Sequence, residues 1–275
     1  LTVRVGTSFS ESYTCTSGVP QGGVLSPLLF LIYTIELPEL LKTGSDIHVQ
    51  IYADDIKIYA AYEDASTSSA QQALRLSVER MNEWASSWDI PLNLNKCSVM
   101  HFGNATAIDY VINGIHLPSA RSTKDLGVIF DTSLKFSSHI DSVVKKALAT
   151  LFLVMRNTRC SDLSIVLRLY KAYVLPHLEY CSQLWSPYLK KDFRRFERVQ
   201  HVFTLMLWYR SKSTATIPPY RVRLKLLSLH SLQYRRVMTD LVFCFRVLRK
   251  ELTLSASKYW TFRPTSERLG GFNLH

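Results

Sequence analysis

The sequence predicts an α+β protein in which a mixed amino-terminal part precedes an all-helical, basic carboxyl-terminal part. Short segments of alternating apolar and polar residues dominate residues 1–135, and helical spacing of apolar residues dominates residues 136–275. The charge changes at nearly the same place, because residues 1–140 hold 9 Lys+Arg against 14 Asp+Glu whereas residues 141–275 hold 24 against 8. These observations predict two modules, residues 1–135 and 136–275.

The composition is that of a globular protein, with 47% hydrophobic and 20% charged residues. The chain has only 10 glycines and 5 cysteines, which excludes collagen-like and disulfide-scaffold proteins. The cysteines form no C-x-x-C motif, so they predict reduced thiols in an intracellular protein and no zinc site. The apolar stretch Val24–Ile35 is too short to cross a bilayer and no signal peptide is present, so we expect a nuclear or cytoplasmic protein without a membrane partner.

The first elements are two short strands and a glycine-rich loop. Leu1–Val5 and part of Phe9–Cys15 alternate, which predicts strands around a turn at Gly6. Residues 17–23 then read Ser-Gly-Val-Pro-Gln-Gly-Gly, which predicts a loop.

A helix is expected after this loop, with Ser26 as its N-cap and Pro27 at its first helical position. The run Leu28–Leu37 is apolar on nearly all sides, so we expect the helix to be buried. Pro38 marks its expected end.

Two carboxylates are expected at the tip of a β-hairpin. Ile47–Tyr52 and Ile56–Tyr59 alternate, and Ala53-Asp54-Asp55 lies between them as a tight reversal. Adjacent carboxylates repel each other, and a divalent cation such as Mg²⁺ would relieve that repulsion. The alternative is an ordinary surface turn, because aspartate is a common turn residue.

The rest of the chain predicts further elements. A helix is expected over Ala65–Trp88, and short strands over Lys96–Phe102, Tyr110–Ile112 and Asp125–Phe130. Beyond Asp131 the expected helices are His139–Asn157, Leu163–Tyr173, Leu178–Trp185, Lys190–Arg210 and Ser228–Glu251.

The basic module is a candidate for binding a polyanion such as nucleic acid. The residues expected to contact a nucleic-acid backbone share one helix: Lys190, Lys191, Arg194, Arg195 and Arg198. The alternative is a set of solvated helix faces on a generally basic surface. We expect Trp185 and Tyr180 to be core residues and not platforms for base stacking.

Four ordered blocks resemble reverse transcriptases. Tyr52-Ala53-Asp54-Asp55 resembles their catalytic hairpin, and residues 17–22 with 25–30 resemble their P-Q-G loop and helix. Residues 92–97 resemble the segment after the palm helix, and residues 125–131 resemble the strand pair that grips the primer end. In the basic half, residues 169–185 and 223–241 look like the thumb of non-LTR (LINE-type) retrotransposon polymerases.

This resemblance implies the right-hand polymerase fold, with a partial palm over residues 1–135 and a thumb over residues 136–275. It implies RNA-directed DNA polymerase activity, in which two Mg²⁺ ions join a deoxynucleotide triphosphate to a DNA primer on an RNA template. An unrelated basic helical protein would leave the four blocks unexplained. The other reading is a non-catalytic, nucleic-acid-binding remnant of such an element.

The resemblance also assigns site residues. It implies that Asp54 and Asp55 are catalytic metal ligands and that Tyr52 packs near the primer terminus. Lys96 is implied to lie near the triphosphate, although a surface lysine at a strand start is equally expected. The residues implied to face the templating base and incoming nucleotide are Pro20, Gln21 and Gly22, and those implied to grip the primer are Leu126, Gly127 and Val128.

Two departures from the family pattern limit this expectation. Gly23 replaces the small polar residue that usually follows P-Q-G, which we expect to loosen the loop. The family's further carboxylate lies on an earlier palm strand, and we expect the chain to begin after that strand and after the fingers. Asp46 matches no such motif. We therefore expect the 275 residues alone to bind metal weakly and not to polymerise DNA.

Overall fold

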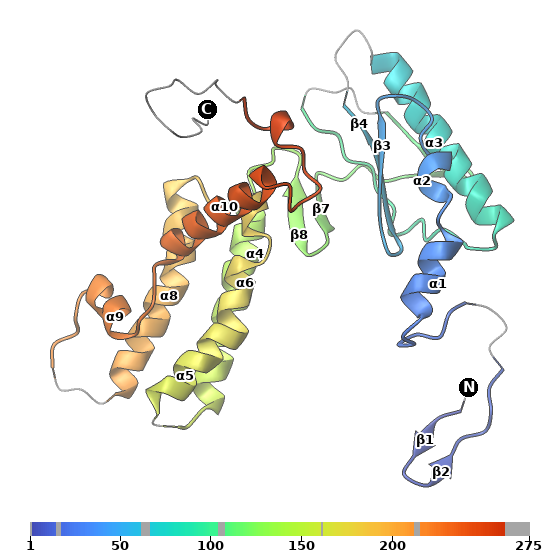
Figure 1. Ribbon diagram of the computed structural model, residues 1–275. Coiled ribbons are helices and arrows are strands. Elements are labelled where there is room, and N and C mark those ends of the chain that lie inside the picture. The colour runs from blue at the N-terminus through green and yellow to red at the C-terminus, as the bar shows by residue number, and fades with distance from the viewer. Residues whose placement is uncertain are drawn as a thin grey trace. The chain divides into compact units, whose positions relative to one another are not determined.

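The computed structural model describes residues 2–14, 18–61, 67–103, 108–160, 162–211 and 215–261. The chain forms two compact units, Leu1–Ala120 and Arg121–His275 (Figure 1). Residues 125–131, which resemble the primer-gripping strands, therefore belong to the second unit together with the carboxyl-terminal helices. The assignment of residues 1–135 to a palm and 136–275 to a thumb stays a prediction about function.

The first unit is built from short antiparallel pairs and three helices. Its strands are β1 (Arg4–Val5), β2 (Ser8–Phe9), β3 (Ile47–Tyr52), β4 (Asp55–Ala60), β5 (Val111–Ile112) and β6 (Ile115–His116), and its helices are α1 (Ser26–Tyr33), α2 (Leu37–Leu40) and α3 (Thr67–Ser87). The described strands pair as four two-stranded antiparallel sheets, β1–β2, β3–β4, β5–β6 and, in the second unit, β7–β8. The predicted hairpin over residues 47–59 and the predicted helix after residue 65 are confirmed.

The core of the first unit fixes the β3–β4 hairpin against helices. Its buried residues are Leu37, Leu41, Met81, Trp84 and Ala85, and the hairpin contributes Val49, Ile51, Ile56 and Ile58. The α3 residues Met81, Trp84 and Ala85 are spaced three and four apart, so they form one apolar stripe. Packing this stripe on one face of the hairpin supports both strands.

Helix α1 differs from its prediction in two ways. Leu25 occupies the N-cap position and Ser26 is already helical, with Pro27 in the first turn. The helix is also exposed, because Leu28, Leu29, Leu31 and Ile32 each keep about half of their surface accessible. Apolar residues on all sides predict burial only when neighbours cover all sides. In the described part of the unit, Ser26 and Tyr33 connect α1 to other segments through hydrogen bonds and, for Tyr33, ring contacts.

Several expected boundaries were wrong. Pro38 is the second residue of α2 instead of ending the preceding helix, because a proline fits the first helical turn. The expected strand Lys96–Phe102 is reduced to a single bridge between Val99 and Ser119. Its first residues form local turns, with Lys96 N–H bonded to Asn93 O at 2.9 Å. β1 and β2 are shorter than expected, and Cys15 lies outside the described residues.

The second unit begins with a hairpin and continues as helices. Its elements are β7 (Ser122–Asp125), β8 (Val128–Asp131), α4 (Ser137–Asn157), α5 (Leu163–Leu169), a π-helical turn (Tyr170–Val174), α6 (Leu175–Glu179), α7 (Ser182–Trp185), α8 (Lys190–Arg210), α9 (Tyr220–Leu226), α10 (Leu232–Leu248) and a 3₁₀ turn (Ala256–Lys258). Helix α4 packs against both α6 and α8 (Figure 1). The helices expected at residues 139–157 and 190–210 are confirmed.

The two helices expected at Leu163–Tyr173 and Leu178–Trp185 are divided differently. The helical path runs through a π turn into α6, because Pro176 has no N–H and Leu175 N–H bonds to Tyr170 O. It breaks at Cys181, whose φ of 52° is left-handed. The short helix α9 was not predicted.

Large buried side chains hold the helical unit together. Trp185, Tyr170, Phe196 and Phe203 are less than 2% exposed. Tyr170 stacks on Phe203 with ring centroids 3.9 Å apart, which joins the π turn to α8. Among the described helices, none is long and apolar enough to cross a membrane.

Candidate active site and nucleic-acid interface

The aspartate pair lies at the turn of the β3–β4 hairpin. Tyr52 pairs with Asp55 in the antiparallel register, so Ala53 and Asp54 form a two-residue turn. Ala53 adopts a left-handed φ of 51°, as tight hairpin turns require. Because Ile51 and Ile56 anchor the last strand pair in the core, the turn is held on a rigid support.

Both carboxylates are exposed, and Tyr52 beside them is 65% exposed. Among the described residues, Asp54 and Asp55 belong to no group of three or more metal-ligating side chains. Two adjacent exposed carboxylates fit the usual share that a protein contributes to Mg²⁺, which takes its other ligands from water and substrate phosphates. The pair therefore suits a metal that is held partly by its substrate.

The P-Q-G loop is a set of exposed residues before α1. Gly18 and Gly22 have φ values of 78° and 86°, which glycine adopts without strain. Pro20, Gln21 and Gly22 are all exposed, and Ser17 lies outside the described residues. In the described part of the first unit, no hydrogen bond or ion pair joins this loop or Lys96 to Asp54 or Asp55. The structure thus brings the two aspartates together with Tyr52, but it does not join the other predicted nucleotide-contacting residues to them.

Gly23 tightens the loop, contrary to the expectation that it loosens it. Its N–H donates to Pro20 O at 3.1 Å, and the Ser26 hydroxyl donates to the same carbonyl. A Cβ atom on residue 23 would lie 2.6 Å from the Ser26 hydroxyl oxygen and 3.2 Å from Pro20 O. A side chain at this position would therefore push the Ser26 hydroxyl away from Pro20.

The predicted primer-gripping residues form the turn and first strand residue of the β7–β8 hairpin. Leu126 and Gly127 have φ values of 43° and 88° and are exposed, whereas Val128 is 2% exposed. The Tyr180 hydroxyl donates to Leu126 O at 2.8 Å, and the Tyr180 ring lies 3.4 Å from the position that a Cβ atom on residue 127 would take. Tyr180 is 55% exposed, so the expectation that it is a core residue was wrong.

A buried histidine holds the other side of this hairpin. His139 is 3% exposed, and its Nδ1 accepts a hydrogen bond from Ile129 N–H at 3.2 Å. Its ring meets the Trp185 ring edge-on, with centroids 4.7 Å apart. Burial, assisted by the positive charge of Arg236, lowers the pKa of His139, so the neutral imidazole can accept this bond.

Trp185 lies at the centre of a buried polar cluster, which confirms it as a core residue. The Arg236 guanidinium lies 4.2 Å from the ring centroids of both Trp185 and Phe196. Arg236 donates to Leu178 O at 3.0 Å, and burial lowers its pKa to about 10. The arginine is charged at neutral pH and stabilised by two aromatic faces.

The five basic residues predicted to contact a nucleic-acid backbone are all exposed on α8: Lys190, Lys191, Arg194, Arg195 and Arg198. Arg195 pairs with Asp141 on α4 at 2.5 Å. The other four have no carboxylate partner among the described residues. The unit that carries them has 27 Lys+Arg against 10 Asp+Glu over residues 121–275. This helix therefore offers an exposed cationic stripe.

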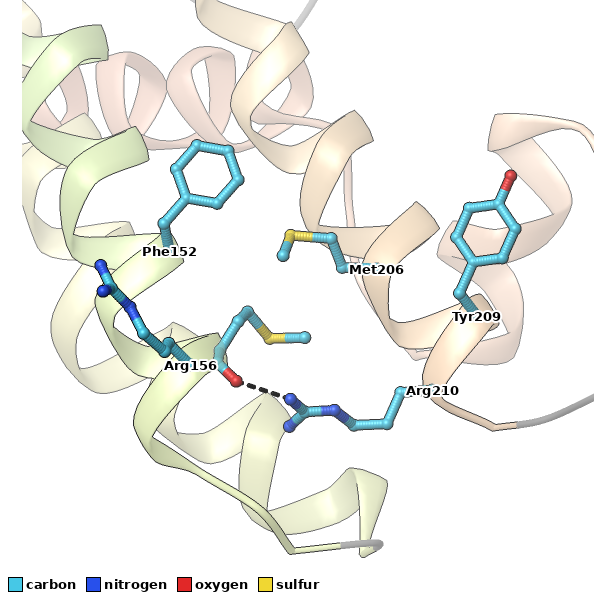
Figure 2. Close-up of a pocket in the computed structure, with 6 residues that line it drawn as sticks. Phe152, Arg156, Met206, Tyr209 and Arg210 are labelled. Atoms are coloured by element: carbon cyan, nitrogen blue, oxygen red, sulfur yellow. Dashed lines mark hydrogen bonds between the residues drawn. The ribbon is translucent and has the colours of Figure 1, made fainter.

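A surface cavity of about 530 Å³ lies between α4 and α8 (Figure 2). It is lined by Phe152, Met155, Arg156, Met206, Tyr209 and Arg210. Arg210 reaches across to α4, where it donates to Met155 O at 2.6 Å and to Thr158 O at 2.8 Å. Nothing in the sequence pairs Tyr209 and Arg210 with Phe152 and Arg156, more than 50 residues earlier.

Comparisons with known proteins show which family the chain resembles. Residues 2–130 match the family described as reverse transcriptase (RNA-dependent DNA polymerase). The chain is 33% identical over 181 residues to the RNA-directed DNA polymerase from mobile element jockey of Drosophila funebris, a match covering 62% of this chain and 19% of that protein. It is 26% identical over 206 residues to the probable RNA-directed DNA polymerase from transposon X-element of Drosophila melanogaster, covering 72% and 22%.

A third relative is the probable RNA-directed DNA polymerase from transposon BS of Drosophila melanogaster, 25% identical over 232 residues that cover 80% of this chain and 24% of that protein. The chain thus spans about a fifth to a quarter of the length of these relatives. No solved structure matches the chain. Residues 2–130 are thus similar to reverse transcriptases, and the chain is similar to the RNA-directed DNA polymerases of Drosophila mobile elements.

Proposed function

We propose that this chain supplies the catalytic aspartate hairpin and the thumb of an RNA-directed DNA polymerase that extends a DNA primer on an RNA template. The observation that carries the proposal is the position of Asp54 in the two-residue turn and of Asp55 at the start of β4, on a hairpin whose strands are packed into a core. The family match over residues 2–130 supports it.

In this proposal Asp54 and Asp55 hold Mg²⁺ together with the phosphates of the incoming nucleotide. When bound, two metal ions stabilise the attacking and leaving oxygens of the in-line displacement. The rigid β3–β4 strands keep both carboxylates at one place during the reaction. We infer that Tyr52 packs beside the primer terminus, which is supported by its exposure and its pairing with Asp55 in the register.

The remaining predicted residues bind and orient substrates. Pro20, Gln21 and Gly22 face the templating base and nucleotide, and Lys96 neutralises the triphosphate. The Leu126–Val128 turn contacts the primer strand. The cationic stripe on α8 binds the backbone of the template–primer duplex.

The same proposal holds that the chain alone does not polymerise DNA. Two exposed carboxylates leave most of the metal's ligands to water, so the ions are bound weakly and are poorly positioned. The test is a primer-extension assay with the purified chain, an RNA template, a DNA primer, deoxynucleotides and Mg²⁺. No template-dependent incorporation is expected, and incorporation that Asp54→Asn abolishes would overturn this part.

A metal-binding experiment distinguishes the proposed polymerase function from a non-catalytic, nucleic-acid-binding one. Mn²⁺ replaces Mg²⁺ in this experiment, and its binding is detected by electron paramagnetic resonance. The proposal expects weak binding that the Asp54→Asn/Asp55→Asn variant removes, with Asp46→Asn as the control. The competing function, a non-catalytic nucleic-acid-binding protein, is favoured by the charge of the helical unit. It would be supported by nucleic-acid binding without any metal binding that depends on Asp54 and Asp55.

A further inference from the structure

The cavity between α4 and α8 has the composition of a site for a single nucleic-acid strand. We propose that it binds an unstacked base of single-stranded RNA, with the adjoining phosphates on Arg156 and Arg210. This inference rests on the proposed function and adds a separate site for the unpaired template, apart from the stripe that binds the duplex.

Two aromatic rings from different helices border the cavity. Phe152 of α4 is 48% exposed and Tyr209 of α8 is 66% exposed, so both rings are accessible to a ligand. Met155 is 6% exposed and Met206 is partly buried. Figure 2 shows Phe152 and Met206 facing the same space from the two helices. Base stacking on aromatic rings is the common means by which proteins bind single strands, because every base has a flat face.

The charge of the cavity suits phosphate. Its six lining residues include two arginines and no carboxylate. Arg210 is fixed by its bonds to two α4 carbonyls and retains N–H groups for a further acceptor. Arg156 is exposed, and no carboxylate pairs with it among the residues that the structure describes. Phosphate oxygens complement these two guanidinium groups.

The cavity continues the cationic stripe along α8. Tyr209 follows Arg198 by three helical turns, so the two side chains lie on nearly the same face about 16 Å apart. A strand whose phosphates follow Arg194 and Arg198 would therefore reach Tyr209 after a few nucleotides. The size of the cavity, about 530 Å³, lies within the range of about 300–1,000 Å³ typical of small-ligand sites, which admits one nucleotide.

A duplex cannot use this site in the same way. Its bases are already stacked on one another and offer only their edges and backbone, whereas a single strand can turn a base outward. The proposal therefore predicts that the cavity distinguishes single strands from duplexes, while the stripe binds both.

The test compares binding of a fluorescent single-stranded RNA and of a blunt RNA–DNA duplex by the full chain at fixed salt. Phe152→Leu/Tyr209→Leu keeps the cavity apolar but removes both rings. We expect its affinity for the single strand to fall at least about fivefold, with duplex affinity unchanged. Tyr209→Trp should retain single-strand binding. The matched control is Tyr173→Leu, which removes a tyrosine that is 59% exposed and does not line the cavity.

A second measurement does not depend on folding of the variant. RNA containing 4-thiouridine is photo-crosslinked to the wild-type chain, and crosslinks are expected on the peptides that contain Phe152 or Tyr209. Crosslinks confined to other peptides, or equal loss of single-strand and duplex binding in the double variant, would overturn the inference. If the wild-type chain binds both ligands and the cavity variants bind them with the same affinity, the inference about the cavity is refuted but the proposed function is not. If the wild-type chain binds neither ligand, the proposed function is refuted.

Discussion

The hydroxyl of Tyr180 donates a hydrogen bond to the backbone carbonyl of Leu126 across 2.8 Å. This bond joins the break between α6 and α7 to the turn of the β7–β8 hairpin. The turn needs such support, because Leu126 is a non-glycine residue with a φ of 43°. The segment that contains the predicted primer-contacting residues is thus held in place by a residue more than 50 positions later in the chain.

Replacing Tyr180 with phenylalanine removes this bond and keeps the ring against Gly127. We expect the free energy of unfolding to fall by about 0.5–1 kcal/mol, the value of one partly exposed hydrogen bond. We also expect faster amide hydrogen exchange at residues 126–129. Urea unfolding and exchange measured by mass spectrometry test this. Tyr173→Phe is the control, and equal effects of the two variants would refute the role of the bond.

The buried histidine predicts an acid-sensitive helical unit. The pKa of His139 in the fold is below its ordinary value of 6.5 because burial and the charge of Arg236 disfavour protonation. Between these two pKa values the unfolded chain binds more protons, so stability is full above about pH 6.5 and falls as the pH decreases below it. His177 and His201 also have pKa values lowered by burial and act in the same direction.

His139→Gln removes one of these three contributions. We therefore expect urea unfolding at pH 7.5 and pH 5.5 to give a smaller difference in stability for the variant than for the wild type. An unchanged difference would show that His139 does not carry the effect. Exchange at Ile129 N–H reports directly whether the bond to Nδ1 has been lost.

We expect truncation of the Arg236 side chain to destabilise the fold strongly, although the side chain is charged. Its side chain fills the space between Trp185 and Phe196 and satisfies Leu178 O. Arg236→Ala should lower the free energy of unfolding by about 2–4 kcal/mol, because it leaves a cavity and an unpaired carbonyl. Arg246→Ala, on the exposed side of the same helix, should cost less than about 0.5 kcal/mol. Thermal denaturation of both variants tests this, and similar losses would contradict it.

We expect two neighbouring arginines of the cationic stripe to contribute unequally to nucleic-acid binding. Arg195 is paired with Asp141, whereas Arg198 has no carboxylate partner among the described residues. If both lie along a nucleic-acid backbone, Arg198→Gln should reduce the slope of log affinity against log salt by about 1, as the loss of one phosphate contact does. Arg195→Gln should reduce it less.

Fluorescence anisotropy with an RNA–DNA duplex at several salt concentrations measures these slopes. Arg246→Gln, outside the stripe, is the matched control. A larger effect of Arg195→Gln than of Arg198→Gln would contradict the prediction, as would an affinity that does not change with salt.

Local patterns predicted the elements that depend on local interactions. Alternation on both sides of Ala53-Asp54 was enough for the β3–β4 hairpin, because a two-residue turn fixes its register. The bounds of α8 were predicted as found, since a long amphipathic pattern lies between turn residues. The seven-residue helix α9 was too short to give a periodic signal.

Burial and long-range pairing were not predictable in the same way. Periodicity showed that α1 is apolar, but it does not say how many of its sides are covered. Tyr180 was expected in the core, yet it is exposed and is followed by the left-handed residue Cys181, which redirects the chain. The cluster around Arg236 joins segments more than 40 residues apart, which no local pattern reveals.

In the candidate site, too, local features were predictable from the sequence and long-range contacts were not. The aspartate hairpin and the α8 residues were found from the sequence because each lies within one element. The contacts of Tyr180 and His139 with the β7–β8 hairpin, and the cavity between α4 and α8, appeared only when distant segments were brought together. The roles of Asp54, Asp55 and the substrate-contacting residues stay predictions.

The central claim is that Asp54 lies in the catalytic hairpin of an RNA-directed DNA polymerase. The most direct measurement is RNA-templated primer extension by the Drosophila funebris polymerase in which the matching segment is replaced by this chain. The account predicts Mg²⁺-dependent extension that Asp54→Asn lowers at least about 100-fold, because metal ions supply several kcal/mol of transition-state stabilisation. Equal extension by the Asp54→Asn hybrid and the unmodified hybrid, or a folded but inactive unmodified hybrid, would contradict it.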